Sequence, residues 1–392
     1  MDSSAITFSF FLIFSGAALF ATLALYTRQP LIIAYIALGA CIGPFGASLV
    51  TGTKLLGDIG HVGIIFLLFL LGLDMQPQAL WATLRKSTVV AIFSSCIFMG
   101  MGYAVALLFG FSQVDSLIIG AAMMFSSTII GIKLLPTTVL HHRHIGELMI
   151  GLLLFQDLLA IIVLMVLFSA AEGGDAGGMA KGLTLSLLGL PLLAGGALLI
   201  VRYVLLPLIA RFDRFHEYIF LLAIGWCLGL AECAKLLGLS EEIGAFIAGI
   251  TIATSPISQY IAVNLKPLRD FFLILFFFSV GARFDFTLLG DVWAPALLLS
   301  LLVLGLKPVT YRFLLKGVSE KRTLAWDLGF RLGQASEFSL LIAYVAIGNA
   351  LISEQASLLI QATTIITLLA SSYIVVLNYP TPIAISDRLR RD

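Results

Sequence analysis

Charged side chains inside long apolar stretches are the residues of this chain best suited to chemistry. Asp157 lies near the middle of one such stretch, 145–170, and a carboxylate at that depth in a bilayer is costly. Burial disfavours its charged form, so either a proton or a cation can neutralise it, but not both well. This competition predicts exchange of a monovalent cation against a proton at Asp157. The alternative is a structural hydrogen bond or ion pair.

Two polar groups belong with Asp157. Gln156 precedes it, and an amide oxygen can bind a hard cation without adding charge. Successive helical residues point about 100° apart, so a polar contact between helices is an equal alternative for Gln156. The run Ser126, Ser127 and Thr128 would expose hydroxyls and carbonyls if its helix unwinds, as in many transporters. Small polar residues in this run also suit close helix packing.

A second polar stretch contains Gln334, Ser336 and Glu337 within an otherwise apolar segment. This composition predicts another interrupted helix, whose half-helix would present its positive end to Glu337. Structural pairing with Asp327 and Arg331 is the alternative for Glu337. For Arg331 we favour a structural role.

Lys307 lies before Pro308 in a further apolar segment. A buried lysine needs a carboxylate partner or must lose its proton. Asp157 is a suitable partner, and a cation that bound Asp157 would then release Lys307. Snorkelling of the side chain towards the cytoplasm is an equally weighted alternative.

The composition is that of a protein embedded in a lipid bilayer. Of 392 residues, 60% are hydrophobic and only 11% are charged, against about 25% charged in soluble domains. The net charge of +1 gives no sign of a nucleic-acid partner. The sequence has no His-Glu-x-x-His or Gly-x-Ser-x-Gly motif of an enzyme, and no Thr-Val-Gly-Tyr-Gly filter of a potassium channel. No cofactor is expected, and K⁺ or Na⁺ and H⁺ are the expected substrates.

We expect about thirteen transmembrane helices, since a spanning helix needs about 20 mostly apolar residues. With the N-terminus outside and the C-terminus inside, seventeen of the 23 Lys and Arg residues fall in the cytoplasm and four outside. The count allows two inverted six-helix repeats joined by one crossing helix. The predicted segments are 5–26, 30–50, 59–74, 87–110, 115–135, 145–170, 182–210, 216–236, 240–256, 267–286, 290–313, 323–348 and 353–378.

Several motifs, taken in order, resemble the membrane domain of Kef-type proteins, in the second family of monovalent cation/proton antiporters. The resemblance covers nearly the whole chain. The motifs are Gly43-Pro44-Phe45-Gly46, Phe69-Leu70-Leu71-Gly72-Leu73-Asp74, Ser126-Ser127-Thr128, Phe155-Gln156-Asp157, Gly244-Ala245-Phe246-Ile247-Ala248-Gly249, Phe276-Phe277-Phe278-Ser279-Val280-Gly281 and Gly333-Gln334-Ala335-Ser336-Glu337-Phe338.

The resemblance implies an all-α, sodium/proton-antiporter-like fold with two crossed, broken helices, and a homodimer in the bacterial inner membrane. In residues 1–380 it implies dimerisation helices 1–3 and 8–10, core helices 4–6 and 11–13, and linker helix 7. An elevator movement of the core would carry Asp157 between the two sides. The Gln-Asp pair favours potassium, because sodium exchangers of the superfamily often carry two aspartates there. In those members the lysine matching Lys307 pairs with the first aspartate, which is Gln156 here.

Two departures from the Kef pattern qualify this expectation. Residues 381–392 are expected to form a cytoplasmic tail, and the nucleotide-binding regulatory domain of Kef-type proteins is absent from this chain. Such a domain or subunit remains a possible partner. Residues 255–265 lack the acidic loop of glutathione-gated members, so glutathione gating is not supported. The alternatives to potassium/proton exchange are a sodium/proton antiporter and a gated potassium efflux channel.

Overall fold

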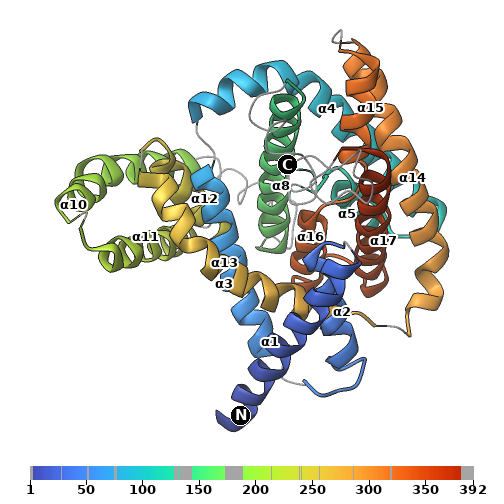
Figure 1. Ribbon diagram of the computed structural model, residues 1–392, viewed down its shortest axis with the longest axis horizontal. Helices are drawn as coiled ribbons and strands as arrows, with labels where there is room; N and C mark the ends of the chain where they lie inside the picture. The colour runs from blue at the N-terminus through green and yellow to red at the C-terminus, as the bar shows by residue number, and fades with distance from the viewer. Residues whose placement is uncertain are drawn as a thin grey trace. The chain divides into compact units, whose positions relative to one another are not determined.

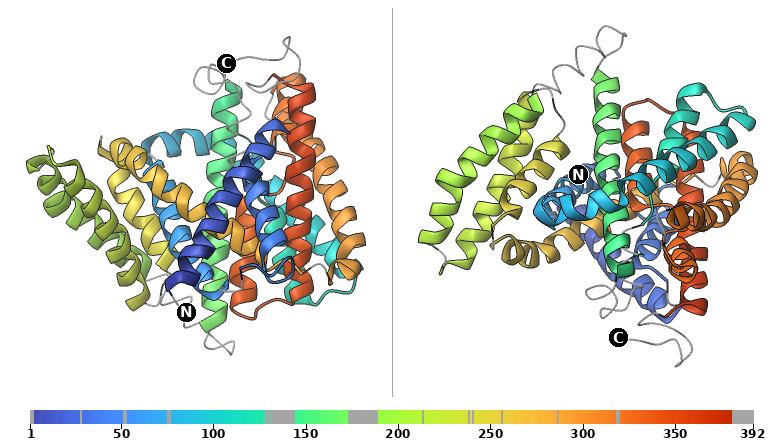
Figure 2. Two further views of the ribbon diagram at one scale, coloured as in Figure 1. Left: turned by 60° about the horizontal axis from the view of Figure 1, so that its bottom comes forward. Right: turned by 90° about the horizontal axis from the view of Figure 1, so that it is seen from above.

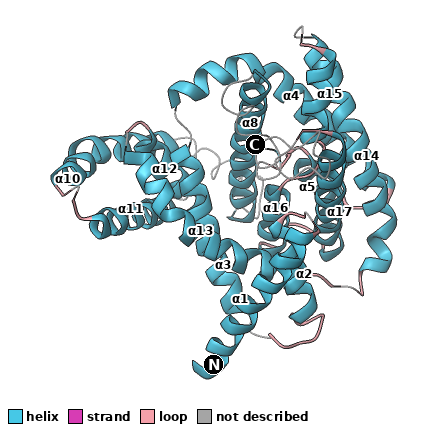
Figure 3. Ribbon diagram, viewed as in Figure 1, coloured by secondary structure: helices cyan, strands magenta, loops and turns pink. Residues whose placement is uncertain are grey.

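The computed structural model describes residues 3–27, 29–50, 53–74, 77–127, 131, 144–172, 189–212, 214–237, 239, 241–255, 257–285, 287–317 and 320–380. Within these ranges the regular structure is helical and no strand is present (Figures 1 and 3). The prediction of an all-α protein is confirmed for this part of the chain.

The helices of the N-terminal third follow the predicted segments with shifted ends. The predicted segment 30–50 is wrong in its second half, because its helix gives way to a turn at Gly43. Pro44 follows, and a proline disfavours helical backbone at the residue before it. The helices are α1 (Ser3–Tyr26), α2 (Leu31–Ile42), α3 (Thr53–Asp74), α4 (Pro77–Leu108) and α5 (Gln113–Met123).

Helices α3 and α4 begin before the predicted positions 59 and 87. Hydrophobicity marks only the part of a helix that the lipid covers, so a helix with a polar first turn is longer than its apolar stretch. Pro77 opens α4, where a proline costs no hydrogen bond because the first N–H groups of a helix have no internal partner.

In the middle of the chain the structure describes an irregular turn, η1 (Val201–Leu205), which is wider than an α-helix. It directly precedes Pro207, whose missing N–H removes one helical hydrogen bond. Helix α13 starts at Ile257, well before the predicted position 267. Pro267 lies inside this helix and does not begin it. The elements are α8 (His144–Glu172), helical residues 189–200, η1, α10 (Leu206–Arg211), α11 (His216–Leu236), α12 (Glu241–Ala253) and α13 (Ile257–Ala282).

The C-terminal elements are α14 (Leu289–Gly317), α15 (Arg322–Arg331), α16 (Glu337–Gly348) and α17 (Glu354–Asn378). The predicted segment 323–348 is therefore divided between α15 and α16, as its polar stretch indicates. Helix α17 packs against α14 and α16, and Figure 2 shows α14 and α17 side by side.

Among the described residues, six helices are long and apolar enough to cross a membrane. Shorter apolar helices include α2, α5, part of α8, and α16. These helices agree with an integral membrane protein. The six spans are Thr7–Tyr26, Thr88–Leu108, Gly189–Arg211, Glu217–Leu236, Leu289–Gly317 and Glu354–Asn378.

The chain divides into two compact units. Unit 1 comprises 1–49, 82–164 and 280–392, and unit 2 comprises 50–81 and 165–279. The predicted division into dimerisation, linker and core helices remains a prediction.

Glycines of the sequence motifs bring helices close together within each unit. In unit 2, a side chain at Gly249 of α12 would collide with the carbonyl oxygen of Phe69 in α3. In unit 1, a side chain at Gly281 of α13 would collide with the carbonyl oxygen of Ile36 in α2. Helices in membranes use small residues in this way to bring their backbones close. These four positions therefore serve packing.

Candidate ion site

Two interrupted helices of unit 1 form the centre of the candidate site. Helix α5 ends at Met123, and residues 125–127 are not helical. Residue 131 is again helical, and Gly131 N donates to Ser127 O at 3.0 Å. Helix α15 ends at Arg331, and α16 starts only after Ser336. The polar stretches around Ser126 and Gln334 are thus interruptions, as predicted.

The two interruptions lie against each other. Ser126 Oγ donates to Leu332 O at 2.8 Å, and Ser339 Oγ donates to Ala122 O at 2.5 Å. Helices α5, α16 and α17 pack on one another around this point (Figure 1). The last carbonyls of a helix have no partner inside it, so the hydroxyls of Ser126 and of Ser339, in the first turn of α16, satisfy two of them.

Lys307 of α14 joins both interruptions. Its side chain is fully buried. Nζ donates to Phe125 O at 2.6 Å and to Gln334 O at 2.9 Å, with Ser126 Oγ at 3.3 Å. These three acceptors match the three N–H donors of an ammonium group, and the Phe98 ring lies 5.1 Å from Nζ. A positive charge at the carboxyl end of α5 also suits the helix dipole.

Gln156 of α8 holds the α5 interruption from the other side. Its Oε1 accepts from Ser126 N at 3.0 Å, and its Nε2 donates to Tyr311 Oη at 2.9 Å. Tyr311 follows Lys307 by four residues, so both side chains lie on one face of α14. The amide of Gln156 therefore orients the interruption and keeps one lone pair of Oε1 for a further partner.

Asp157 is only 2% exposed and follows Gln156 on α8. Consecutive Cα atoms are about 3.8 Å apart, so the backbone of Asp157 lies next to that of Gln156, the residue that bonds to Ser126 N. Ser127 is fully buried in the α5 interruption. Thr128, the other predicted oxygen donor, lies outside the described residues.

The second interruption is held by α17 and by its own cap. Ser336 Oγ accepts from Phe338 N at 3.2 Å and so begins α16. Ser371 Oγ donates to Gln334 Oε1 at 2.8 Å, and Thr367 Oγ1 accepts from Ala335 N at 3.1 Å. The polar backbone of this interruption therefore has side-chain partners deep in the protein.

Glu337 is 7% exposed and is the first residue of α16. A carboxylate there faces the positive end of the helix. The other predicted charge in this stretch, Arg331, donates from Nε to Asp327 Oδ1 at 2.6 Å and from Nη2 to Pro380 O at 2.8 Å. The structural role favoured for Arg331 is therefore confirmed.

Sequence reasoning missed Tyr311, Thr367 and Ser371, which position Gln156 and the second interruption. A tyrosine hydroxyl in an apolar helix is a usable signal, since a buried hydroxyl requires a partner. Thr367 and Ser371 give no such signal, because small polar residues in membrane helices more often serve packing.

The arrangement offers buried oxygen atoms from carboxylates, an amide and hydroxyls. In the part of the chain that the structure describes, no group of three His, Cys, Asp or Glu side chains could hold a metal ion. Oxygen donors of this kind suit hard cations and protons. This set of donors is the basis for the function proposed below.

Comparison with known proteins finds relatives over most of the chain. Residues 11–377 match the family described as sodium/hydrogen exchanger, transmembrane. The glutathione-regulated potassium-efflux system protein KefC of Klebsiella pneumoniae is 30% identical over 350 residues, covering 84% of this chain and 54% of that relative. The ammonium/H(+) antiporter subunit AmhT of Alkalihalophilus pseudofirmus is 30% identical over 347 residues, covering 87% of this chain and 86% of AmhT. The chain thus spans about half the length of KefC.

A solved structure supports the fold. The sodium proton antiporter MjNhaP1 of Methanocaldococcus jannaschii superimposes with a TM-score of 0.72 at 19% identity, covering 95% of this chain and 96% of MjNhaP1. The resemblance to Kef-type membrane domains is confirmed by the family match and by the KefC relative. The chain belongs to the transmembrane family of sodium/hydrogen exchangers.

Proposed function

We propose that the chain exchanges a monovalent cation for a proton across the membrane, with Asp157 as the group that binds either one. The position of Asp157 carries this proposal. Its carboxylate is 2% exposed in an apolar helix, one residue from the amide that orients the α5 interruption. Burial disfavours the charged carboxylate, so a bound proton or a bound cation stabilises it. A cation that binds from one side therefore displaces the proton.

The neighbouring oxygens complete the proposed site. Ser127 and Thr128 supply hydroxyl or carbonyl oxygens, and Gln156 offers the remaining lone pair of Oε1. Lys307 acts indirectly, since its ammonium holds the carbonyls of both interruptions in place. Ser126, Gln334, Ser336 and Glu337 belong to the same supporting framework.

Potassium is the proposed cation, and efflux is the proposed direction of its net movement. The neutral Gln156 beside Asp157 and the KefC relative support potassium. Sodium/proton exchange is the second candidate, favoured by the family match and by the fold of MjNhaP1. With one carboxylate and a neutral neighbour, one cation is exchanged for one proton without net current.

The wider architecture follows the family resemblance. We infer thirteen crossings in two inverted repeats, a homodimer, and an elevator movement of the helices that carry Asp157. The proposed location is the bacterial inner membrane, with the N-terminus outside and the C-terminus inside. These inferences rest on the motifs and on the charge distribution of the predicted loops.

Exchange in proteoliposomes tests the proposal. Vesicles with an enclosed pH dye receive a proton gradient and then potassium, sodium or lithium chloride. Native protein should dissipate the gradient with potassium, and Asp157→Asn should lower the rate at least about 100-fold, equivalent to ~2.7 kcal/mol of barrier. The matched control is Asp291→Asn, because Asp291 is an exposed carboxylate at the start of α14.

The outcomes separate the candidates. A response to sodium alone would replace potassium by sodium and keep the exchange mechanism. Cation flux without proton movement, retained in Asp157→Asn, would overturn the proposal in favour of a gated channel.

A further inference from the structure

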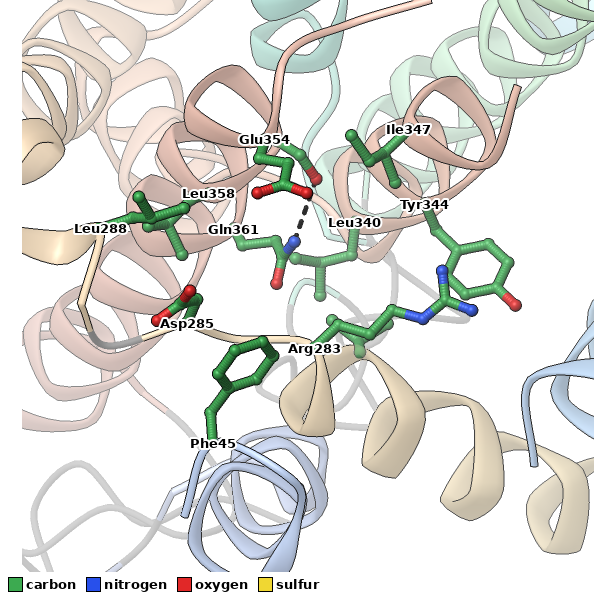
Figure 4. Close-up of a pocket in the computed structure, with 12 residues that line it drawn as sticks. Phe45, Arg283, Asp285, Leu288, Leu340, Tyr344, Ile347, Glu354, Leu358 and Gln361 are labelled. Atoms are coloured by element: carbon green, nitrogen blue, oxygen red, sulfur yellow. Dashed lines mark hydrogen bonds between the residues drawn. The ribbon is translucent and has the colours of Figure 1, made fainter. Parts of the chain in front are cut away.

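A polar cavity of unit 1 lies at the end of α16 and the start of α17 (Figure 4), and Asp157 is not among its lining residues. Its volume is about 250 Å³, while a single water needs only roughly 10–15 Å³ of such space. The cavity therefore has room for an ion and several waters. We call it the Gln361 pocket. Its polar lining residues are Arg283, Asp285, Tyr344, Glu354, Ser357 and Gln361.

Gln361 presents an amide oxygen that has no hydrogen-bond partner in the structure. The side chain is 8% exposed, and Nε2 donates to Ser357 Oγ at 3.1 Å. This bond fixes the amide so that Oε1 points into the cavity (Figure 4). Burial of a polar atom without a partner is unfavourable, and such atoms in folded proteins usually meet water or a ligand.

The charges around Gln361 Oε1 favour a cation. Asp285 and Glu354 each contribute a carboxylate (Figure 4). Oδ1 of Asp285 accepts from Thr287 N and Thr287 Oγ1, which holds the carboxylate in place. The single guanidinium of the pocket, that of Arg283, lies over the Tyr344 ring at 4.7 Å, away from Gln361.

The pocket therefore combines a net negative charge with oxygen donors. Carboxylate and amide oxygens are the donors that hard cations prefer. A negative pocket with apolar walls also concentrates cations from solution. Leu340 and Leu358 supply such walls.

A buried polar stripe on α17 joins this pocket to the interrupted helices. Ser357, Gln361, Thr364, Thr367 and Ser371 follow one another at intervals of three or four residues, so they share one helix face. All five are buried. The stripe ends at the second interruption, where Thr367 and Ser371 contact Ala335 and Gln334.

We propose that the Gln361 pocket is a second monovalent-cation site, through which the transported ion passes between the membrane surface and Asp157. The role of this site in transport rests on the proposed exchange function. Binding of a cation to the site does not. Gln361 Oε1 and the carboxylates of Asp285 and Glu354 are the ligands. The charge distribution of the predicted loops places this end of the protein outside.

Rubidium-86 binding tests the site without transport. In purified Asp157→Asn protein the main site is disabled, so the remaining binding measures the Gln361 pocket. We expect binding to persist in Asp157→Asn and to weaken about tenfold or more when Gln361→Leu is added. Addition of Gln355→Leu should leave it unchanged, since Gln355 is an exposed glutamine on the same helix. Glu354→Gln, at an exposed position, tests the site if Gln361→Leu does not fold.

Sided exchange assays test the role in transport. Gln361→Leu should raise the apparent KM for the cation about tenfold at one membrane face only, with little change in maximal rate. Absence of rubidium binding in Asp157→Asn, or equal binding with and without Gln361→Leu, would overturn the second site. Displacement of rubidium by calcium at far lower concentration would overturn its monovalent character. Failure of native exchange with persistent rubidium binding would refute the proposed function alone.

Discussion

The interrupted helices of unit 1 and the α3–α12 contact of unit 2 use opposite means to bring backbones together. At the α3–α12 contact, Gly249 faces the carbonyl of Phe69 with no side chain between them. Around the interruptions, side chains such as Lys307 and Gln156 bind the exposed backbone groups. The α3–α12 contact depends on the absence of a side chain at Gly249. The contacts around the interruptions depend on particular polar side-chain atoms.

The difference follows from the solvent. Inside a bilayer, non-helical backbone is tolerated only where protein groups satisfy it. Unit 1 satisfies its interruptions with a buried ammonium, an amide and hydroxyls, and these polar groups surround the proposed ion site. Unit 2 keeps its helices intact at the α3–α12 contact, so the backbone groups there bond within their own helices.

The largest expected effect is that of Lys307→Met. The substitution leaves Phe125 O and Gln334 O buried without their donor. Each unsatisfied group costs roughly 1–3 kcal/mol, so the two together lower the stability by about 2–6 kcal/mol. Thermal unfolding and exchange should both suffer, whereas Lys316→Met, at an exposed position of the same helix, should change neither. A normal melting temperature in Lys307→Met would contradict the bridging role.

A smaller effect is expected for Gly249→Ala in unit 2. The added methyl group meets the Phe69 carbonyl, and overpacking costs typically ~1–3 kcal/mol. Thermal unfolding should shift down, while the exchange rate per folded molecule should stay near the native value. Gly229→Ala in α11 is the matched control, because nothing lies within 4 Å of the added atom. Loss of exchange in Gly249→Ala with unchanged stability would break the comparison.

The smallest effect is expected for Tyr311→Phe. The ring remains and only the hydroxyl that accepts from Gln156 is lost. One neutral hydrogen bond contributes about 1 kcal/mol. Exchange should fall by less than about tenfold, which corresponds to ~1.4 kcal/mol. A loss as large as that of Asp157→Asn would mean that Tyr311 itself takes part in ion binding.

Part of this organisation is readable from the sequence. A single carboxylate in an apolar helix marks Asp157, and Gly, Gln and Ser within an apolar segment predict the interruption at residues 332–336. Helix ends are harder to predict, because hydrophobicity indicates which residues contact lipid and not where a helix starts. The start of α13 is an example. Proline is the exception, and Pro44 would have been a signal for the end of α2.

The contacts of Lys307 were beyond sequence reasoning. Its acceptors lie 182 and 27 residues away along the chain, and both are backbone carbonyls, which every residue carries. The sequence therefore suggested a carboxylate partner or snorkelling, whereas the described contacts of Nζ are to the two interruptions. A motif also does not reveal the role of its residues. Gly249 and Gln156 belong to equally clear motifs, but Gly249 serves helix packing, whereas Gln156 makes polar contacts.

The most direct test of competition at Asp157 is the number of protons released when the cation binds. Calorimetric titration of purified protein with potassium chloride, in two buffers of different ionisation enthalpy, gives this number. We expect up to one proton per cation at a pH where Asp157 is protonated, and none in Asp157→Asn. Cation binding to native protein without proton release at any pH at which the protein stays folded would contradict the account.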